Sequence, residues 1–269
     1  MSAPGRAAGG TELWLVRQPS TGTAADDFDR GVLDDTERER AGTCRRSAGG
    51  RLYALAHIAL RRLLGHRLGL PPAEILFVRE PCPGCGEPHG RPAVHPDQAG
   101  RAGGAPTHFS LSHGSGLVLL GLSSAPIGVD VEQLPGGETV QICAPALHPD
   151  EYAELAALGD TARRQAFGRL WTRKEAYLKG IGTGLSRGLS ADYLGTERTR
   201  HPRGWAVRDL PCDPGHVAAV AWRGAAGSPV TARSLALEWL RQQTPGAPYG
   251  ALLLPLTPRR REPSHARHS

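Results

Sequence analysis

The chain has 269 residues, of which 39% are hydrophobic and 5% aromatic, and its formal net charge is +6. This length suffices for one large domain or for two smaller halves that each bury a core. The terminal segment TPRRREPSHARHS holds four arginines against one glutamate, so it carries half of the excess charge. Basic residues are not interleaved with aromatic ones, which argues against a nucleic-acid-binding surface and favours a protein that handles phosphates or an acidic partner.

The sequence shows no signal for export or for a membrane. No apolar run approaches the roughly 20 residues that span a bilayer, and MSAPGRAAGG at the start lacks the apolar core of a signal peptide. The cysteines number five, an odd count that does not fit a secreted disulfide framework. We therefore expect a soluble, cytoplasmic protein without a membrane partner.

The first half of the chain alternates strand and helix patterns. TELWLVRQP predicts a strand, and residues 34–69 contain a long helical pattern in which Gly65 and Gly69 offer stop signals. EILFV predicts a short strand, followed by the turn-rich loop EPCPGCGEPHGRPAVHP. Residues 107–134 then predict two or three strands joined by tight turns.

The second half repeats this style. HPDEYAELAAL and residues 162–181 predict helices, and LSADYLG, GWAVRDL and HVAAVAW predict antiparallel strands. Helices with about three short strands in each half indicate an α+β fold of two lobes. We expect a disordered N-terminus at 1–11, an N-terminal lobe at 12–125, a C-terminal lobe at 126–245 and a Pro/Arg-rich, largely disordered tail at 246–269.

The segment IGVDVE at 127–132 combines an apolar strand with two acids. Side chains alternate along a strand, so Asp130 and Glu132 share one face while Val129 and Val131 point into the core. Adjacent buried carboxylates repel unless a cation lies between them, and oxygen ligands suit a hard divalent ion such as Mg²⁺. The simpler alternative is a half-exposed strand with a solvated acidic face.

The helix pattern WTRKEAYLKGIGTGL at 171–185 carries a second set of charges. Trp171, Glu175 and Lys179 recur at every fourth position and therefore line one helix face. Glu175 could complete a cation site or take a proton, and Lys179 could neutralise a phosphate. An ordinary glutamate–lysine pair on a helix surface is the alternative.

Together these two segments resemble the 4′-phosphopantetheinyl transferases, whose signature pairs an (I/V)G(I/V)D(I/V)E strand with a W(S/T)xKE(A/S)xxK helix. Both patterns are complete and in order, and the C-terminal one follows about 40 residues after the first. GRP at 90–92 and FSLSHG at 109–114 resemble two further elements of the family. The length is similar to that of the larger, single-chain type that acts on synthase carrier proteins.

The resemblance implies a fold of two pseudo-twofold-related lobes that bind coenzyme A and Mg²⁺, or alternatively Mn²⁺, between them. The implied reaction moves the 4′-phosphopantetheine arm of coenzyme A to a serine of an apo acyl or peptidyl carrier protein, and 3′,5′-ADP leaves. Asp130, Glu132 and Glu175 would hold the metal. Glu175 would serve as general base, directly or through a water, and Lys179 would stabilise charge on the pyrophosphate. A monomer without a nucleic-acid partner is expected.

The resemblance also implies a coenzyme A site outside the two motifs. Ser112 and His113 match the pair that faces the coenzyme phosphates. Gly90, Arg91 and Pro92 match the element next to the adenine, although arginine stands where the family usually has lysine. The 3′-phosphate would be clamped by basic residues of the region 37–51, for which the match is loosest; the candidates are Arg38, Arg40 and Arg51.

The loop CPGCGEPH brings Cys82, Cys85 and His89 together in the sequence. A CxxC pair followed by a histidine could be half of a zinc site, but no second pair follows to complete four ligands. A reduced, metal-free loop that presents Gly90–Pro92 is therefore the preferred interpretation. The alternative function is a non-catalytic zinc or nucleic-acid-binding module, which leaves the acidic strand and the helix motif unexplained.

Overall fold

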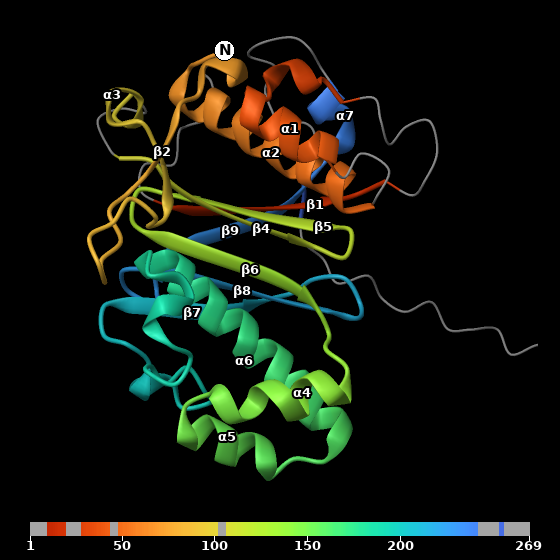
Figure 1. Ribbon diagram of the computed structural model, residues 1–269, viewed down its shortest axis with the longest axis vertical. Coiled ribbons are helices and arrows are strands. Elements are labelled where there is room, and N and C mark those ends of the chain that lie inside the picture. Colours follow the sequence, from red (N-terminus) through yellow and green to blue (C-terminus); the bar gives the residue numbers. More distant parts are fainter. Residues whose placement is uncertain (1–9, 20–27, 44–47, 102–105, 242–252, 256–269) are drawn as a thin grey trace, which may run out of the picture.

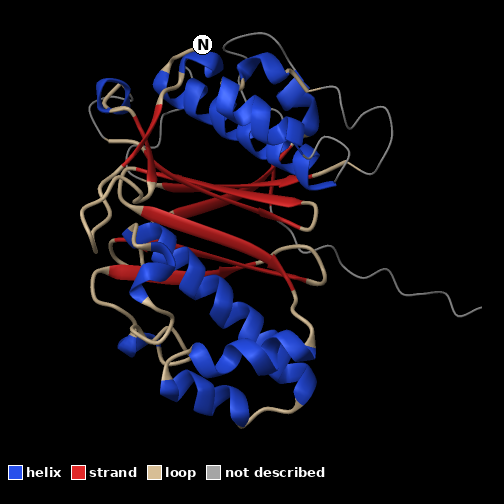
Figure 2. Cartoon of the chain, in the orientation of Figure 1, coloured by secondary structure: helices blue, strands red, loops and turns tan. Residues whose placement is uncertain are grey.

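The computed structural model describes residues 10–19, 28–43, 48–101, 106–241 and 253–255. The structure is a mixed α+β fold of four layers, seen edge-on in Figure 1 and by element type in Figure 2. A helical layer covers one sheet, a second sheet lies against the first, and a further helical layer covers the second sheet. In the described part of the chain, no helix is long and apolar enough to cross a membrane.

The described strands are β1 Thr11–Arg17, β2 Phe77–Arg79, β3 Pro92–Val94, β4 His108–Gly114, β5 Leu117–Ser123, β6 Ile127–Gln133, β7 Trp205–Leu210, β8 His216–Arg223, β9 Val230–Leu235 and β10 Leu253–Pro255. The described helices are α1 Asp35–Thr43, α2 Ala48–Leu68, α3 Pro96–Ala99, α4 Gly137–Cys143, α5 Pro149–Ala156, α6 Asp160–Ile181 and α7 Leu237–Arg241. A 3₁₀ turn, η5, spans Gly184–Arg187 after α6.

The strands form two main sheets of unequal size. The larger has the order β10-β9-β1-β5-β4, and the smaller has the order β6-β8-β7. β2 and β3 form a separate two-stranded sheet. The α+β class expected from the sequence is confirmed, whereas the pseudo-twofold relation between two lobes stays a prediction.

The two main sheets share one apolar core. Leu13, Leu15 and Leu119 of the larger sheet pack in the same cluster as Val129 and Val131 of β6. The alternate residues of β1, Trp14 and Val16, belong instead to the cluster with α2. Alternation along the strands thus gives each sheet one face toward the other sheet and one face toward helices.

Two serines join the facing edges of the sheets. β4 is the edge strand of the larger sheet and β6 the edge strand of the smaller one. The Oγ atom of Ser110 accepts from the backbone N–H of Val129 at 3.0 Å, and the Oγ atom of Ser112 accepts from Val131 at 3.4 Å. Side chains therefore satisfy N–H groups of β6 that a neighbouring strand would otherwise pair.

Helix α6 crosses β6 through two glycines. A Cβ on Gly128 would lie 1.9 Å from the carbonyl oxygen of Ala176, and a Cβ on Gly180 would lie 2.6 Å from the ring of Trp205. Both positions therefore require glycine for α6 to lie this close to the strand. The helix ends at Gly182, whose φ of +82° makes it a left-handed cap.

One expected strand differs from the structure. LSADYLG has the pattern of a strand but forms turns and bends. The lobe boundaries at 12–125 and 126–245 stay a prediction, and β9 pairs in parallel with β1 of the larger sheet. Of the ends expected to be disordered, residues 1–9, 246–252 and 256–269 lie outside the described residues, whereas Leu253–Pro255 form β10 on β9.

Candidate functional site

Asp130 is the central residue of the candidate site. It projects from β6 on the face opposite Val129 and Val131, and its side chain is only 2% exposed. Its Oδ1 atom accepts from the Oγ atom of Ser112 at 2.8 Å and lies 2.6 Å from the Nζ atom of Lys179. Lys179 also lies 3.2 Å from Ser112, so a strand of each sheet and α6 meet at this carboxylate.

Two further carboxylates lie near enough to Asp130 to influence it electrostatically. Partial burial raises the pKa of Glu132, and the charge of Asp130 raises it further, while Lys179 acts in the opposite direction. Partial burial likewise raises the pKa of Glu175, with Lys179 lowering it and Asp130 raising it. The structure thus brings the three predicted acids and Lys179 together around the end of β6.

The second oxygen of Asp130 is a candidate ligand for a cation. Oδ2 is buried and has no hydrogen-bond partner, which is costly for a carboxylate oxygen unless a cation satisfies it. A carboxylate oxygen is the kind of ligand that Mg²⁺ prefers. Among the described residues, however, Cys82, Cys85 and His89 are the only group of three or more acidic, histidine or cysteine residues whose ligand atoms all lie within 4.8 Å of one another. The three carboxylates are therefore less tightly grouped than that.

His113 extends the site on β4, next to Ser112. Its ring lies edge-on to Tyr53 with centroids 6.0 Å apart, and Tyr53 stacks on His57 at 4.1 Å. Partial burial lowers the pKa of His113, and the nearby His57 and Lys179 lower it further. Aromatic and imidazole rings thus connect His113 to the middle of α2.

The Gly90–Pro92 element lies where the two halves meet. The Nη1 atom of Arg91 donates to the carbonyl of Gly180 at 2.9 Å, and its Nε atom lies 2.7 Å from Glu80. A Cβ on Gly90 would lie 2.5 Å from the carbonyl oxygen of Glu80, so this tight turn requires glycine. Arg91 therefore ties the loop to the last turn of α6.

The three candidate arginines for the 3′-phosphate are placed differently from one another. Arg38 donates to the carbonyl of Leu33 and pairs with Asp35 on its own helix at 2.5 Å. Arg40 lowers the pKa of Tyr53 by a hydrogen bond, although burial raises that pKa more. Arg40 thus lies beside the ring surface of Tyr53, whereas Arg51 near the start of α2 is half-buried.

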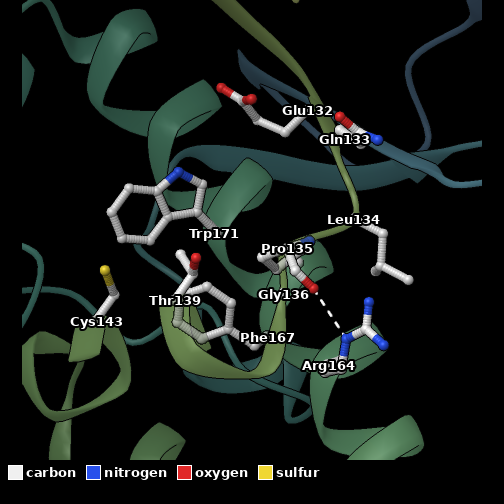
Figure 3. A pocket seen from close by; sticks show the side chains of 11 residues that line it. Glu132, Gln133, Leu134, Pro135, Gly136, Thr139, Cys143, Arg164, Phe167 and Trp171 are labelled. Atoms are coloured by element: carbon white, nitrogen blue, oxygen red, sulfur yellow. Dashed lines mark hydrogen bonds between the residues drawn. The ribbon is translucent and has the colours of Figure 1, made fainter. Parts of the chain in front are cut away.

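A pocket that the sequence did not reveal opens beside Glu132. Its volume is about 620 Å³, and it lies between the chain that leaves β6, helix α4 and helix α6. Figure 3 shows Glu132 at one end and Arg164 at the other, with Phe167 and Trp171 between them. The Nε atom of Arg164 donates to the carbonyl of Pro135 at 2.9 Å, which holds the loop after β6.

Lys174 precedes Glu175 in the helix motif but has a structural role. Its side chain is 3% exposed and lies 2.7 Å from Glu151, which is fully buried. Its Nζ atom also donates to the carbonyls of Leu189 and Asp192 at 2.7 and 2.6 Å. The only sequence signal for this pair was the position of Lys174 among the buried residues of an amphipathic helix.

Comparison with known proteins connects these residues to a family. A sequence model of the 4′-phosphopantetheinyl transferase superfamily matches residues 126–221. The chain is 32% identical over 171 residues to the 4′-phosphopantetheinyl transferase HetI of Nostoc sp., covering 61% of this chain and 68% of that protein.

Two bacterial relatives give similar matches. The chain is 27% identical over 146 residues to the 4′-phosphopantetheinyl transferase gsp of Aneurinibacillus migulanus, covering 54% of each chain. It is 31% identical over 140 residues to a 4′-phosphopantetheinyl transferase of Bacillus subtilis, covering 51% of this chain and 54% of that one. The matched region thus spans about half the length of these two relatives. These comparisons do not favour the alternative of a non-catalytic zinc or nucleic-acid-binding module.

Proposed function

Because the chain belongs to the 4′-phosphopantetheinyl transferase superfamily, we propose that it transfers the 4′-phosphopantetheine arm of coenzyme A to a serine of an apo carrier protein. The serine hydroxyl attacks the phosphorus that bears pantetheine, the bond to the bridging oxygen of the pyrophosphate breaks, and 3′,5′-ADP leaves. The serine proton passes to a base. The observation that supports this proposal best is the environment of the buried Asp130 side chain. Its Oδ1 atom forms an ion pair with Lys179, and its Oδ2 atom has no hydrogen-bond partner.

The residues around Asp130 match the needs of phosphoryl transfer, which depends mainly on positioning and on charge neutralisation. We assign Asp130, Glu132 and Glu175 as ligands of Mg²⁺, which would supply positive charge next to the pyrophosphate. Glu132 and Glu175 lie close enough to Asp130 for its charge to raise the pKa of each, and Oδ2 of Asp130 has no hydrogen-bond partner. Lys179, with 32% of its side chain exposed, would present its ammonium to the phosphates.

Glu175 is the proposed base for the serine proton, directly or through a water. Partial burial raises its pKa, which favours proton uptake, whereas a bound cation would lower that pKa. The pocket beside Glu132 is the proposed place for the pantetheine arm, because its wall combines the rings of Phe167 and Trp171 with polar groups. An arm that contains both methylene and amide groups requires such a mixed wall.

Mass spectrometry of a carrier protein tests the proposal. The full chain is incubated with Mg²⁺, coenzyme A and an apo carrier protein, and the carrier is examined for the mass of phosphopantetheine. The wild type is expected to modify the carrier, and Asp130→Asn and Glu175→Gln are expected to abolish modification. Asp160→Asn is the matched control, because the Asp160 side chain is 98% exposed at the start of α6 and distant in sequence from the site residues of that helix.

Metal binding is measured separately from turnover. Titration with Mn²⁺, followed by the paramagnetic relaxation of water protons, is expected to show a site that Asp130→Asn weakens. Absence of carrier modification by the wild type with several carriers would contradict the proposed activity. Normal modification by both site variants would contradict the assignment of the residues.

A further inference from the structure

The loop between β2 and β3 contains a cluster of metal-binding side chains outside the proposed transfer site. Ligand atoms of Cys82, Cys85 and His89 all lie within 4.8 Å of one another. The Sγ atom of Cys85 lies 2.9 Å from the Nε2 atom of His89. The four described cysteines are free, so no disulfide accounts for the arrangement.

The backbone of this loop is folded tightly around Cys82. The N–H of Cys82 donates to the carbonyl of Glu87, and the N–H of Gly86 donates to the carbonyl of Cys82, both at 2.8 Å. Gly86 has a φ of +79°, a conformation that favours glycine directly after the second cysteine. Cys-Pro-Gly-Cys-Gly therefore forms a compact turn that directs both sulfur atoms to the same side as His89.

Backbone groups surround the sulfur atom of Cys82. The Cys82 side chain is buried, at 2% exposure. The backbone N–H groups of Gly84 and Cys85 donate to its sulfur atom. Thiolate and imidazole are the ligands that zinc prefers, whereas Mg²⁺ prefers oxygen.

We propose that Cys82, Cys85 and His89 form a zinc site, in which a solvent molecule supplies the fourth ligand. The metal-free loop preferred from sequence rested on the lack of a second ligand pair, but three side chains and a water satisfy the coordination number of zinc. The site is separate from the proposed transfer chemistry and does not depend on it.

The position of the cluster indicates what the metal does. Ser186 of η5, which follows α6, lies beside Cys82. Two residues after His89, Arg91 donates to Gly180 in the last turn of α6. The loop therefore contacts the C-terminal half at two places. Bound zinc would fix the conformation in which the loop makes these contacts.

Zinc content of the purified protein tests this proposal. The full chain is prepared under reducing conditions and dialysed against a weak chelator. The zinc content is then measured by elemental mass spectrometry. The wild type is expected to retain about one zinc per chain. Cys85→Ser and His89→Ala are expected to lose most of it. Cys143→Ser and His95→Ala are the controls, because neither residue belongs to the cluster, and both should retain zinc.

Cobalt substitution gives a second readout that does not depend on the stability of the variants. Co²⁺ in the wild type should produce a thiolate-to-metal charge-transfer band, which Cys85→Ser should reduce. The proposal would be overturned if the wild type lost all its zinc during mild dialysis. It would also be overturned if a Cys82→Ser/Cys85→Ser variant retained zinc. The mass of the wild type is also measured under non-reducing conditions. A mass lower by two hydrogens, together with the absence of zinc, would overturn the zinc proposal and indicate a disulfide instead.

Discussion

The two oxygens of Asp130 have different surroundings, and this difference defines the site at the scale of single residues. Oδ1 is held by Ser112 and Lys179, whereas Oδ2 is buried without a partner. The spacing of the acids in IGVDVE could predict that Asp130 and Glu132 share a face. It could not predict that Ser112, from another sheet, would fix one oxygen of Asp130, because that contact depends on how the two sheets meet.

Lys179→Ala should mainly lower the rate constant of transfer. The ammonium of Lys179 lies at the carboxylate that would bind the cation, and its loss removes a positive charge from the place where negative charge develops. We expect kcat to fall by about 10²–10³, as when one stabilising donor is removed from an active site. Steady-state kinetics with coenzyme A and an apo carrier measure this. Arg169→Ala, an exposed change on the same helix, is the control, and an unchanged kcat for Lys179→Ala would remove Lys179 from the mechanism.

Lys174→Met should destabilise the fold without acting on the chemistry directly. The change leaves the fully buried Glu151 without its cation, and such a loss typically costs about 3–5 kcal/mol. Denaturant unfolding measures the loss, with the exposed Arg169→Met as control. A Glu151→Leu/Lys174→Met double variant should lose less than the sum of the single variants, because the ion pair is removed as a unit. Additive losses would show that the two side chains do not stabilise each other.

At the scale of elements, the crossing of α6 over β6 places Glu175 and Lys179 beside Asp130. The contact is through backbone, since Ala176 and Gly180 lie directly against Gly128. Gly128→Ala should therefore push the helix away from the strand, lower the free energy of unfolding by about 1–3 kcal/mol and reduce transfer. Gly137→Ala is the control, because a Cβ there meets nothing within 4 Å. Thermal unfolding and the carrier assay measure the effects, and a Gly128→Ala variant as active and stable as Gly137→Ala would contradict the close crossing.

Helix α6 was predictable from sequence, but the segment after it was not. Its apolar positions and the glycines after Lys179 predict residues 162–181, and the helix spans Asp160–Ile181. LSADYLG has the apolar content of a strand, but its backbone groups are satisfied by buried charges instead. The carbonyl of Leu189 accepts from Lys174, and the N–H of Leu194 donates to Glu151. Local pattern cannot reveal partners that are this distant along the chain.

At the scale of the whole molecule, the pairing of strands that are distant in the chain could not be predicted from the sequence. Alternation predicts β1, β4, β5, β6, β7 and β8 as strands, but it does not say which strands pair. β9 leaves the C-terminal half and pairs with β1 about 220 residues earlier in the chain. The serines of β4 then join that sheet to β6. The candidate site exists only because these long-range contacts bring the motifs together.

The shared core predicts that both sheets unfold together. Leu13 and Leu15 pack in one cluster with Val129 and Val131, so opening either sheet exposes apolar surface of the other. Ser110→Ala would leave the buried N–H of Val129 without its acceptor and should cost about 1–3 kcal/mol. Hydrogen exchange should then show the same loss of protection in Leu117–Ser123 as in His216–Arg223, whereas the exposed Ser190→Ala should change neither. Protection lost in one strand alone would mean that the sheets fold as independent units, and that the site between them forms by docking.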